Sequence, residues 1–218
     1  MEEAFKILYR AGTGEITEKK SRFIAEIRPA DTEEEALAFI DEMRKTYWDA
    51  RHHCFAYRIG RQCQIVRASD DGEPAQTAGK PMLDVLAGQE LHNVCAVVTR
   101  YFGGTLLGTG GLVRAYSQAV QEALKDCVIL EKRPGVRLEV DTDYNGVGKI
   151  QYITAQMGIT ELESLYTDRA AFTYMVPIEE LDTLKSKLTE ATAGRAVLRQ
   201  GDAVYYGLVG KELVLFEK

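Results

Sequence analysis

Five glycines crowd the short segment Gly103–Gly111, which follows the apolar run VCAVVTR at 94–100. Glycine at this density costs conformational entropy, so the backbone there must need positive φ angles or a close approach to other parts of the chain. The apolar run predicts a β-strand that is buried on both faces. The apolar spacing that follows predicts a long helix from about Leu112 to Asp126. This order of elements indicates mixed α and β structure.

The glycine-rich loop is a candidate phosphate-binding site. A loop of this kind at a helix N-terminus exposes backbone N–H groups, and the helix dipole adds partial positive charge. Arg100 and Arg114 flank the loop and could join it in holding a phosphate of a nucleotide or of a nucleic-acid backbone. The alternative is a tight strand-to-helix turn packed against the sheet. The loop has neither a Walker nor a Rossmann glycine pattern. The predicted phosphate-binding glycines are Gly103, Gly104, Gly108, Gly110 and Gly111.

A second cluster surrounds His52. On a strand, residues two apart share a face, so His52, Cys54 and Ala56 are expected on one face and His53 and Phe55 on the other. A Cys and His pair suggests a thiolate nucleophile or a metal ligand. The alternative is a structural or phosphate-facing histidine, because no pattern supplies further zinc ligands.

A third cluster contains Asp70, Asp71 and Glu73. Three carboxylates this close could coordinate a divalent cation, and Mg²⁺ often accompanies a bound phosphate. The same residues could instead make a solvated turn. Together with His52 they are the candidate catalytic residues. We predict no metal site and no cofactor, with Mg²⁺ as the one alternative.

A short basic stretch, KKSRF, precedes these clusters. Lys19, Lys20 and Arg22 could contact phosphates while Phe23 packs or stacks against its surroundings. Solvated charge on a strand edge is the alternative interpretation.

The chain is long enough for two small domains, at about 100–200 residues per domain. Lys132-Arg133-Pro134-Gly135 has the composition of a turn or linker. We therefore predict an N-terminal domain at 1–133 and a C-terminal domain at 136–218.

The elements expected in each half follow from apolar periodicity and from turn residues. In the first half we expect strands at 4–10, 21–28, 54–59, 64–69, 94–100 and 128–131, a turn at Gly12–Gly14, and helices from Asp31–Glu35 to about Trp48 and at 81–91. In the second half we expect strands at 136–142, 158–166, 170–176, 195–207 and 211–216, with helices at 144–157 and 177–192. The order βαββαβ in the second half is that of a ferredoxin-like sandwich.

Composition limits the classes of function. The net charge of −6 argues against a wholly basic nucleic-acid binder, so nucleic-acid binding would depend on a local patch. No segment has the roughly 20 apolar residues of a membrane span, and no signal peptide is visible. We expect a cytoplasmic protein with no membrane partner. The four cysteines are expected to be free thiols, and the oligomeric state is unknown.

Taken in chain order, these clusters resemble the IMPACT / YigZ family. The final motif is long and specific. The matching stretches are KKSRF at 19–23, AxHxCxAY at 50–57, SDDGEP at 69–74, GKPxLxVL at 79–86 and RYFGGxLLGxGGLxRAY at 100–116.

The resemblance implies an α+β chain with two known folds. The N-terminal domain would have the left-handed βαβ fold of domain 2 of ribosomal protein S-five, which domain IV of elongation factor G and the GHMP kinases share. The ferredoxin-like C-terminal domain would be similar to domain V of elongation factor G. Eukaryotic relatives act in translational control through an additional N-terminal domain, so their partner is not carried over. The positions carried over as a site, without an established catalytic role, are His52, Asp70, Asp71, Glu73, Arg100, Gly103, Gly104 and Arg114.

Three functions are therefore weighed. The preferred one is a translation-linked regulatory protein that binds RNA or a ribosome-associated surface through the Arg-flanked, glycine-rich groove. The second is a Mg²⁺-dependent enzyme that acts on a phosphorylated small molecule. The third is a protein-interaction adaptor that uses the open sheet face of the C-terminal domain.

Overall fold

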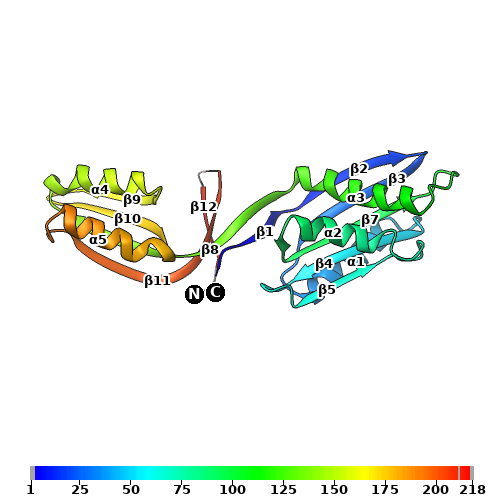
Figure 1. The fold of residues 1–218 in the computed structure, drawn as a ribbon, viewed down its shortest axis with the longest axis horizontal. Coiled ribbons are helices and arrows are strands. Elements are labelled where there is room, and N and C mark those ends of the chain that lie inside the picture. The colour runs from blue at the N-terminus through cyan, green and yellow to red at the C-terminus, as the bar shows by residue number, and fades with distance from the viewer. Residues whose placement is uncertain (1–2, 211, 217–218) are drawn as a thin grey trace. The chain divides into compact units, whose positions relative to one another are not determined.

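The computed structural model describes residues 3–210 and 212–216, which form two sheets, five α-helices and one short 3₁₀-helix (Figure 1). The chain is therefore mixed α+β, as the sequence predicts. It forms two compact units: one is Phe5–Glu131, and the other is the chain from Lys132 onward together with the described residues before Phe5. The named folds that the resemblance implies stay predictions.

The first unit contains most of the candidate site. Its elements in chain order are β1 (Phe5–Arg10), β2 (Gly12–Glu18), β3 (Ser21–Pro29), α1 (Glu33–Thr46), β4 (His52–Ile59), β5 (Ile65–Ser69), α2 (Gly79–Gly88), β6 (Leu91–His92), β7 (Val94–Tyr101), α3 (Thr109–Asp126) and the start of β8 (Val128–Thr142).

The main sheet of this unit has the strand order β2-β3-β7-β4-β5, and all its pairs are antiparallel. Because β3 and β4 both run antiparallel to β7, they are parallel to each other, and α1 joins them in a β–α–β connection. Helix α1 begins as predicted: the Thr32 side chain caps it by accepting a hydrogen bond from the Glu35 N–H at 3.2 Å.

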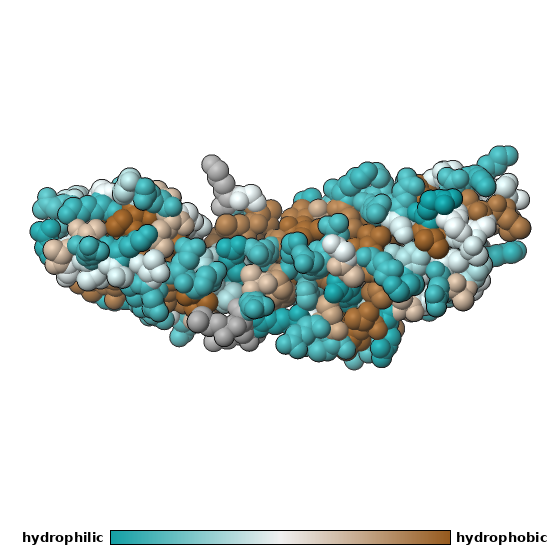
Figure 2. All heavy atoms as spheres, in the orientation of Figure 1, coloured by the Kyte–Doolittle hydropathy of each residue, from teal (hydrophilic) through white to brown (hydrophobic). Residues whose placement is uncertain are grey.

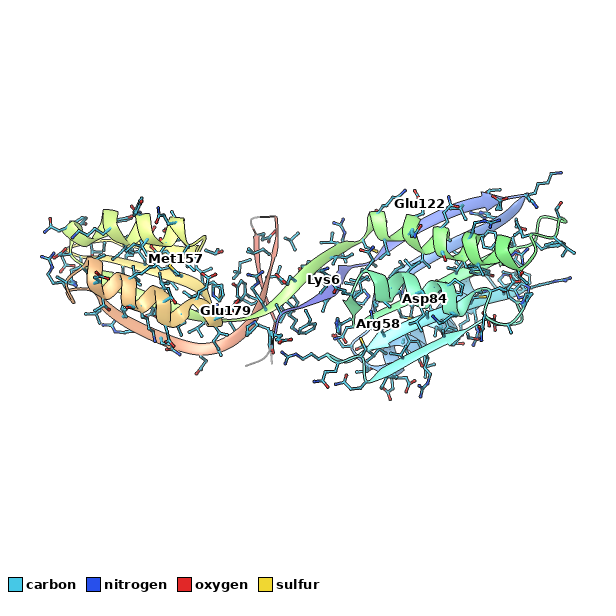
Figure 3. All side chains as sticks on the ribbon, viewed as in Figure 1. Lys6, Arg58, Asp84, Glu122, Met157 and Glu179 are labelled. Carbon is cyan, nitrogen blue, oxygen red and sulfur yellow. The ribbon has the colours of Figure 1, made fainter. Side chains whose placement is uncertain are left out.

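The central strand β7 separates two cores. Ala96 and Val98 pack in the core that α2 and α3 cover. Cys95 and Val97 pack in the core that α1 covers. The prediction of a strand buried on both faces is confirmed, because every residue from 94 to 100 is buried. Helix α2 is also tied to β4, where Arg58 donates a hydrogen bond to the Leu86 carbonyl at 3.2 Å (Figure 3 labels Arg58).

The expected turn at Gly12–Gly14 is wrong, because both glycines lie in strand β2. Their role is close packing. A Cβ at Gly12 would lie 2.6 Å from the Cys127 sulfur, and a Cβ at Gly14 would lie 2.3 Å from the Ala123 nitrogen. Helix α3 therefore approaches β2 at a distance that only glycine permits.

The second unit has the predicted order βαββαβ. Its elements are the rest of β8, α4 (Tyr144–Gln156), β9 (Thr160–Tyr166), β10 (Ala170–Pro177), a 3₁₀-helix (Ile178–Glu180), α5 (Leu181–Ala191), β11 (Val197–Val209) and β12 (Glu212–Phe216). Its strands lie in the order β9-β10-β8-β11-β12. Helices α4 and α5 cover one face, where Ile150 and Leu184 pack against Leu138 and Phe172. Five residues of the predicted ranges (1, 2, 211, 217 and 218) lie outside the described part.

The predicted turn at Lys132-Arg133-Pro134-Gly135 is also wrong, because strand β8 runs through it without interruption. Pro134 and Gly135 pair with Tyr205 and Val204 of β11. A Cβ at Gly135 would lie 2.4 Å from the Tyr206 ring, so the glycine serves packing there.

Hydrophobic side chains reach the surface of each unit among hydrophilic ones (Figure 2). The most exposed large ones are Leu106, at 83%, and Trp48, at 80%. Within the described residues, no α-helix combines the length and apolar character that crossing a bilayer requires.

Candidate functional site

A pocket of about 350 Å³ opens beside the start of α3. Three segments far apart in sequence build it: the residues at the start of β4, the loop after β5, and the stretch from the end of β7 into α3. Its lining residues are Arg51, His52, Glu73, Pro74, Arg100, Phe102, Leu106, Leu107, Gly108, Thr109 and Leu112. Four of the predicted site residues, His52, Glu73, Arg100 and Gly108, are therefore brought together.

The N-terminus of α3 contributes backbone donors to this pocket. The first intrahelical bond runs from the Leu112 N–H to the Gly108 carbonyl at 3.0 Å. The N–H groups of the preceding turn consequently have no acceptor within the helix. Gly108 provides no side-chain cap, and the first turn carries no acidic residue. This helix end thus presents partial positive charge to the pocket.

The glycines of the loop have the geometry that their density predicts. Gly104 and Gly108 have φ angles of 84° and 71°. A Cβ at Gly103 would lie 2.0 Å from the Lys20 carbonyl carbon, so the loop packs directly on the β2–β3 turn. Gly110 and Gly111 lie in the first turn of α3.

Arg100 and Glu73 form a buried ion pair beneath the pocket. The Arg100 NH1 donates to both Glu73 carboxylate oxygens, at 2.7 and 3.0 Å. Their side chains are only 6% and 4% exposed. The Arg100 guanidinium also lies 5.3 Å from the Phe23 ring and 5.6 Å from the Phe102 ring. The charge of Arg100 is thus already compensated by the protein.

Further buried groups complete this network. Tyr116 donates to Glu73 Oε1 at 2.7 Å, and the Cys54 thiol lies 3.3 Å from the Tyr116 hydroxyl. Ser21 accepts from the Arg100 NH2 at 3.3 Å and from the Gly103 N–H at 3.1 Å. Burial raises the pKa of the Cys54 thiol far above its ordinary value, which keeps it protonated and unsuited to act as a nucleophile.

His52 lies on the pocket face of β4, opposite Arg100 in the strand register. Its Nδ1 lies 2.9 Å from the Asp71 carbonyl oxygen. His53 lies on the other face, where its Nε2 contacts the Tyr47 carbonyl at 3.0 Å. The predicted division of this strand into two faces is confirmed.

The two aspartates organise the loop after β5. Asp70 accepts hydrogen bonds from three backbone N–H groups, those of Gln76 at 2.8 Å, Gly79 at 2.9 Å and Ala78 at 3.0 Å. Burial acts to raise the pKa of Asp70, but these three hydrogen bonds together hold it below its ordinary value. Asp70 thereby anchors the start of α2.

Asp71 is held by groups on two other elements. Its Oδ2 accepts from the His53 N–H at 2.7 Å, and its Oδ1 lies 3.4 Å from the Arg44 NH2. The carboxylates of Asp70, Asp71 and Glu73 therefore bind different protein groups. Across the described ranges, no cluster of three or more His, Cys, Asp or Glu side chains is arranged to hold a metal ion.

The basic stretch lies beside the glycine-rich loop. Lys19 and Lys20 form the two-residue turn between β2 and β3, with φ angles of 45° and 67°. Both side chains are exposed. Arg22 instead pairs with Glu15 on the neighbouring strand, with Nε to Oε1 at 2.5 Å. Phe23 is fully buried and packs edge-on against Tyr116.

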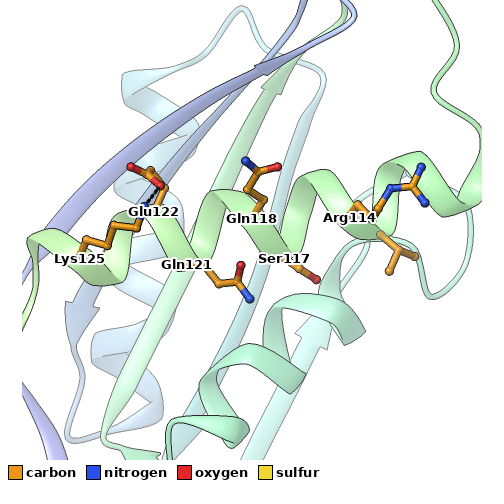
Figure 4. Close-up of a pocket in the computed structure, with 7 residues that line it drawn as sticks. Arg114, Ser117, Gln118, Gln121, Glu122 and Lys125 are labelled. Atoms are coloured by element: carbon orange, nitrogen blue, oxygen red, sulfur yellow. Dashed lines mark hydrogen bonds and ion pairs between the residues drawn. The ribbon is translucent and has the colours of Figure 1, made fainter.

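Arg114 does not share the pocket of Arg100. It lies on the exposed side of α3 and lines a separate hollow of about 490 Å³ (Figure 4). Polar residues of the same helix surround it, and Glu122 pairs there with Lys125 at 2.5 Å. The structure therefore places Arg100 buried beneath the pocket and Arg114 on the exposed side of α3.

Several site residues were not among the sequence-based candidates. Arg51 directly precedes His52, and Phe102 lies within the glycine-rich motif. The buried hydroxyl groups of Tyr116 and Ser21 could have been predicted from the helix and strand periodicity of the sequence. Tyr116 follows Leu112 by four residues on the apolar face of α3, so its hydroxyl needs a buried partner. Ser21 shares a strand face with Phe23 and needs a partner for the same reason.

The arrangement is suited to binding a small anionic group. Backbone N–H groups of α3, the Thr109 position and the exposed Arg51 surround an opening with apolar walls at Phe102 and Leu106. Arg51 has no ion-pair partner among the described residues. A helix N-terminus next to an unpaired arginine attracts phosphate.

The sequence is similar to known proteins over most of its length. Residues 19–124 match the Impact N-terminal domain, and residues 140–195 match a domain of unknown function (DUF1949). The IMPACT family member YvyE of Bacillus subtilis is 40% identical over 195 residues, covering 89% of this chain and 90% of that protein. The IMPACT family member YigZ of Escherichia coli is 38% identical over 178 residues, covering 81% of this chain and 87% of that protein.

One solved structure is similar over nearly the same length. It is described as "Crystal structure of an hypothetical protein" and is 36% identical to this chain. The match covers 91% of this chain and 97% of the other, with a TM-score of 0.59.

Proposed function

The chain belongs to the IMPACT family, and from this premise we propose that it is a translation-linked regulatory protein that binds RNA through the pocket beside α3. The link to translation is carried over from the family resemblance described above. On a ribosome-associated surface, the same pocket would contact exposed ribosomal RNA.

One observation carries the proposal: the uncapped, acid-free N-terminus of α3 opens into a pocket that also holds the unpaired Arg51. Partial charge on the backbone N–H groups favours an anion at this position. The guanidinium adds a full charge with a geometry that matches phosphate oxygens.

The apolar wall of the pocket favours a nucleotide over a simple anion. Phe102 is 52% exposed and Leu106 is 83% exposed, so both present apolar surface to solvent. Single-stranded nucleic acids bind where a basic groove adjoins an aromatic ring on which a base stacks. The exposed lysines at the β2–β3 turn, Lys19 and Lys20, extend the positive charge beside the loop.

The net charge of −6 makes this a local site on an acidic protein. Repulsion from the rest of the surface weakens association, and counterion release makes binding fall steeply as salt rises. The binding assay therefore belongs at low ionic strength.

The test is fluorescence anisotropy with a labelled single-stranded hexamer of adenylate in 50 mM salt. Replacing Arg51 by Ala removes one phosphate contact, so we expect a roughly fivefold loss of affinity and a shallower salt dependence. Replacing Phe102 by Ala removes the stacking surface, and we expect a loss of roughly tenfold.

Lys125→Ala is the matched control, because it removes an exposed cation from the opposite end of the same helix, outside the pocket. We expect this variant to bind as the parent does. Equal losses in Arg51→Ala and Lys125→Ala would place the binding surface elsewhere. No binding by the parent protein in low salt would refute the RNA proposal.

A further inference from the structure

His52 has one ring nitrogen committed to the protein and the other directed away from that contact. Its Nδ1 lies 2.9 Å from the Asp71 carbonyl oxygen. A carbonyl oxygen can only accept a hydrogen bond, so Nδ1 carries the proton of the neutral ring. The other nitrogen, Nε2, is then a hydrogen-bond acceptor.

The surroundings of the ring hold this arrangement. The edge of His52 that carries Nδ1 and Cε1 faces the Asp71–Gly72 turn, where a Cβ at Gly72 would lie 3.4 Å from Nδ1. That turn is itself fixed, because Asp71 accepts from the His53 N–H at 2.7 Å. No group in the described part of the chain pairs with the His52 Nε2. The imidazole lines the pocket, so this acceptor is available to a bound molecule.

The other polar groups around the pocket are mostly donors or are already engaged. Arg51 and the N–H groups of α3 donate, and Glu73 is paired with Arg100 and Tyr116. Within this donor-rich site, His52 Nε2 can only accept a hydrogen bond, whereas the Thr109 hydroxyl can either donate or accept. A ligand that satisfies Nε2 must bring a hydrogen-bond donor close to a phosphate.

We infer that the pocket selects RNA over DNA, with the His52 Nε2 accepting a hydrogen bond from a ribose 2′-hydroxyl. The sugar-phosphate backbone of DNA contains no hydrogen-bond donor, whereas the 2′-hydroxyl of RNA is a donor attached beside the 3′-phosphate. This inference rests on the proposed function and adds the residue that recognises the sugar.

The experiment compares labelled hexamers of adenylate and deoxyadenylate by anisotropy at pH 8 in 50 mM salt. The bases are identical, so contacts to base edges cancel in the ratio of affinities. One hydrogen bond to a neutral hydroxyl corresponds to a roughly fivefold preference for the RNA hexamer. We expect that preference in the parent protein.

The variant His52→Asn isolates the acceptor. The asparagine amide nitrogen is as many bonds from Cα as Nδ1 is, so it can still donate to the Asp71 carbonyl. The amide oxygen then takes the place of Cδ2 and is one bond too short to reach the place of Nε2. We expect the variant to bind the RNA hexamer as weakly as the DNA hexamer, with unchanged affinity for DNA and an unchanged melting temperature.

His92→Asn is the matched control, since this half-buried histidine contacts Cys63 and lies outside the pocket. It is expected to retain the preference for RNA. Equal binding of both hexamers by the parent, or a preference that survives in His52→Asn, would overturn the inference while leaving the proposed function standing. If neither hexamer binds, both the inference and the proposed function are wrong.

Discussion

The buried ion pair between Glu73 and Arg100 contributes to the free energy of unfolding of the first unit. Replacing Glu73 by Gln would leave a guanidinium buried without a compensating charge. We expect the free energy of unfolding to fall by about 3–5 kcal/mol, because an uncompensated buried charge is costly. Urea denaturation followed by circular dichroism measures this change.

The exposed pair of Arg22 and Glu15 is the natural control. Both side chains are about half exposed, at 52% and 44%. Glu15→Gln is expected to cost less than about 1 kcal/mol, because solvent screens such pairs. Similar small losses in Glu73→Gln and Glu15→Gln would mean that water reaches the Arg100 guanidinium.

Sequence reasoning found most of the important polar residues but not their partners. It singled out Asp70, Glu73 and Arg100 as groups for a ligand or a metal. The structure shows Asp70 accepting backbone N–H groups before α2 and Glu73 compensating Arg100. Such partners depend on which strands lie side by side. Local spacing does not encode the antiparallel register that sets His52 opposite Arg100.

At the scale of elements, some glycines of the glycine-rich motif have no room for a side chain, and others do. Gly103→Ala would force a Cβ to within 2.0 Å of the Lys20 backbone. We expect a loss of about 1–3 kcal/mol or more from this overpacking, together with separation of the loop from the β2–β3 turn. Thermal unfolding measures the loss.

Gly110→Ala is the comparison within the same motif. It lies in the first turn of α3, where only the flexible end of Arg114 comes within 4 Å of an added Cβ. Alanine favours helix over glycine by up to about 1 kcal/mol, so we expect equal or slightly higher stability. If the Gly103→Ala and Gly110→Ala variants have the same melting temperature, the close approach at Gly103 does not constrain the loop.

Elements defined by apolar periodicity were predicted well, and those inferred from glycine and proline were not. The buried strand β7, helix α1 and the βαββαβ order follow from local patterns that the tertiary structure reinforces. Gly12, Gly14 and Gly135 suggest turns locally, yet each lies in a strand where another element packs too closely for a side chain. That closeness is a tertiary property.

At the scale of the whole molecule, each unit has a core of its own. Leu184 is fully buried on α5 among residues of the second unit. Leu184→Ala is expected to destabilise that unit by about 2–5 kcal/mol through the cavity it leaves. Differential scanning calorimetry should show one shifted transition, and RNA affinity should be unchanged.

Leu86→Ala provides the counterpart in the first unit, where Leu86 of α2 is equally buried. This variant should lower the melting temperature of the first unit and leave the transition of the second unit unchanged. A single transition that shifts as a whole in both variants would contradict independent unfolding of the two units.

The buried network of Arg100, Glu73 and their partners also limits which single substitutions the fold can tolerate. Its members come from motifs that lie far apart in the chain, and a change at Glu73 or Arg100 alone leaves a charge stranded until the second position also changes. The network joins Ser21 in KKSRF, Cys54 in AxHxCxAY, Glu73 in SDDGEP, and Arg100, Gly103 and Tyr116 in the glycine-rich motif, so one set of buried contacts ties together four segments that are distant in the chain.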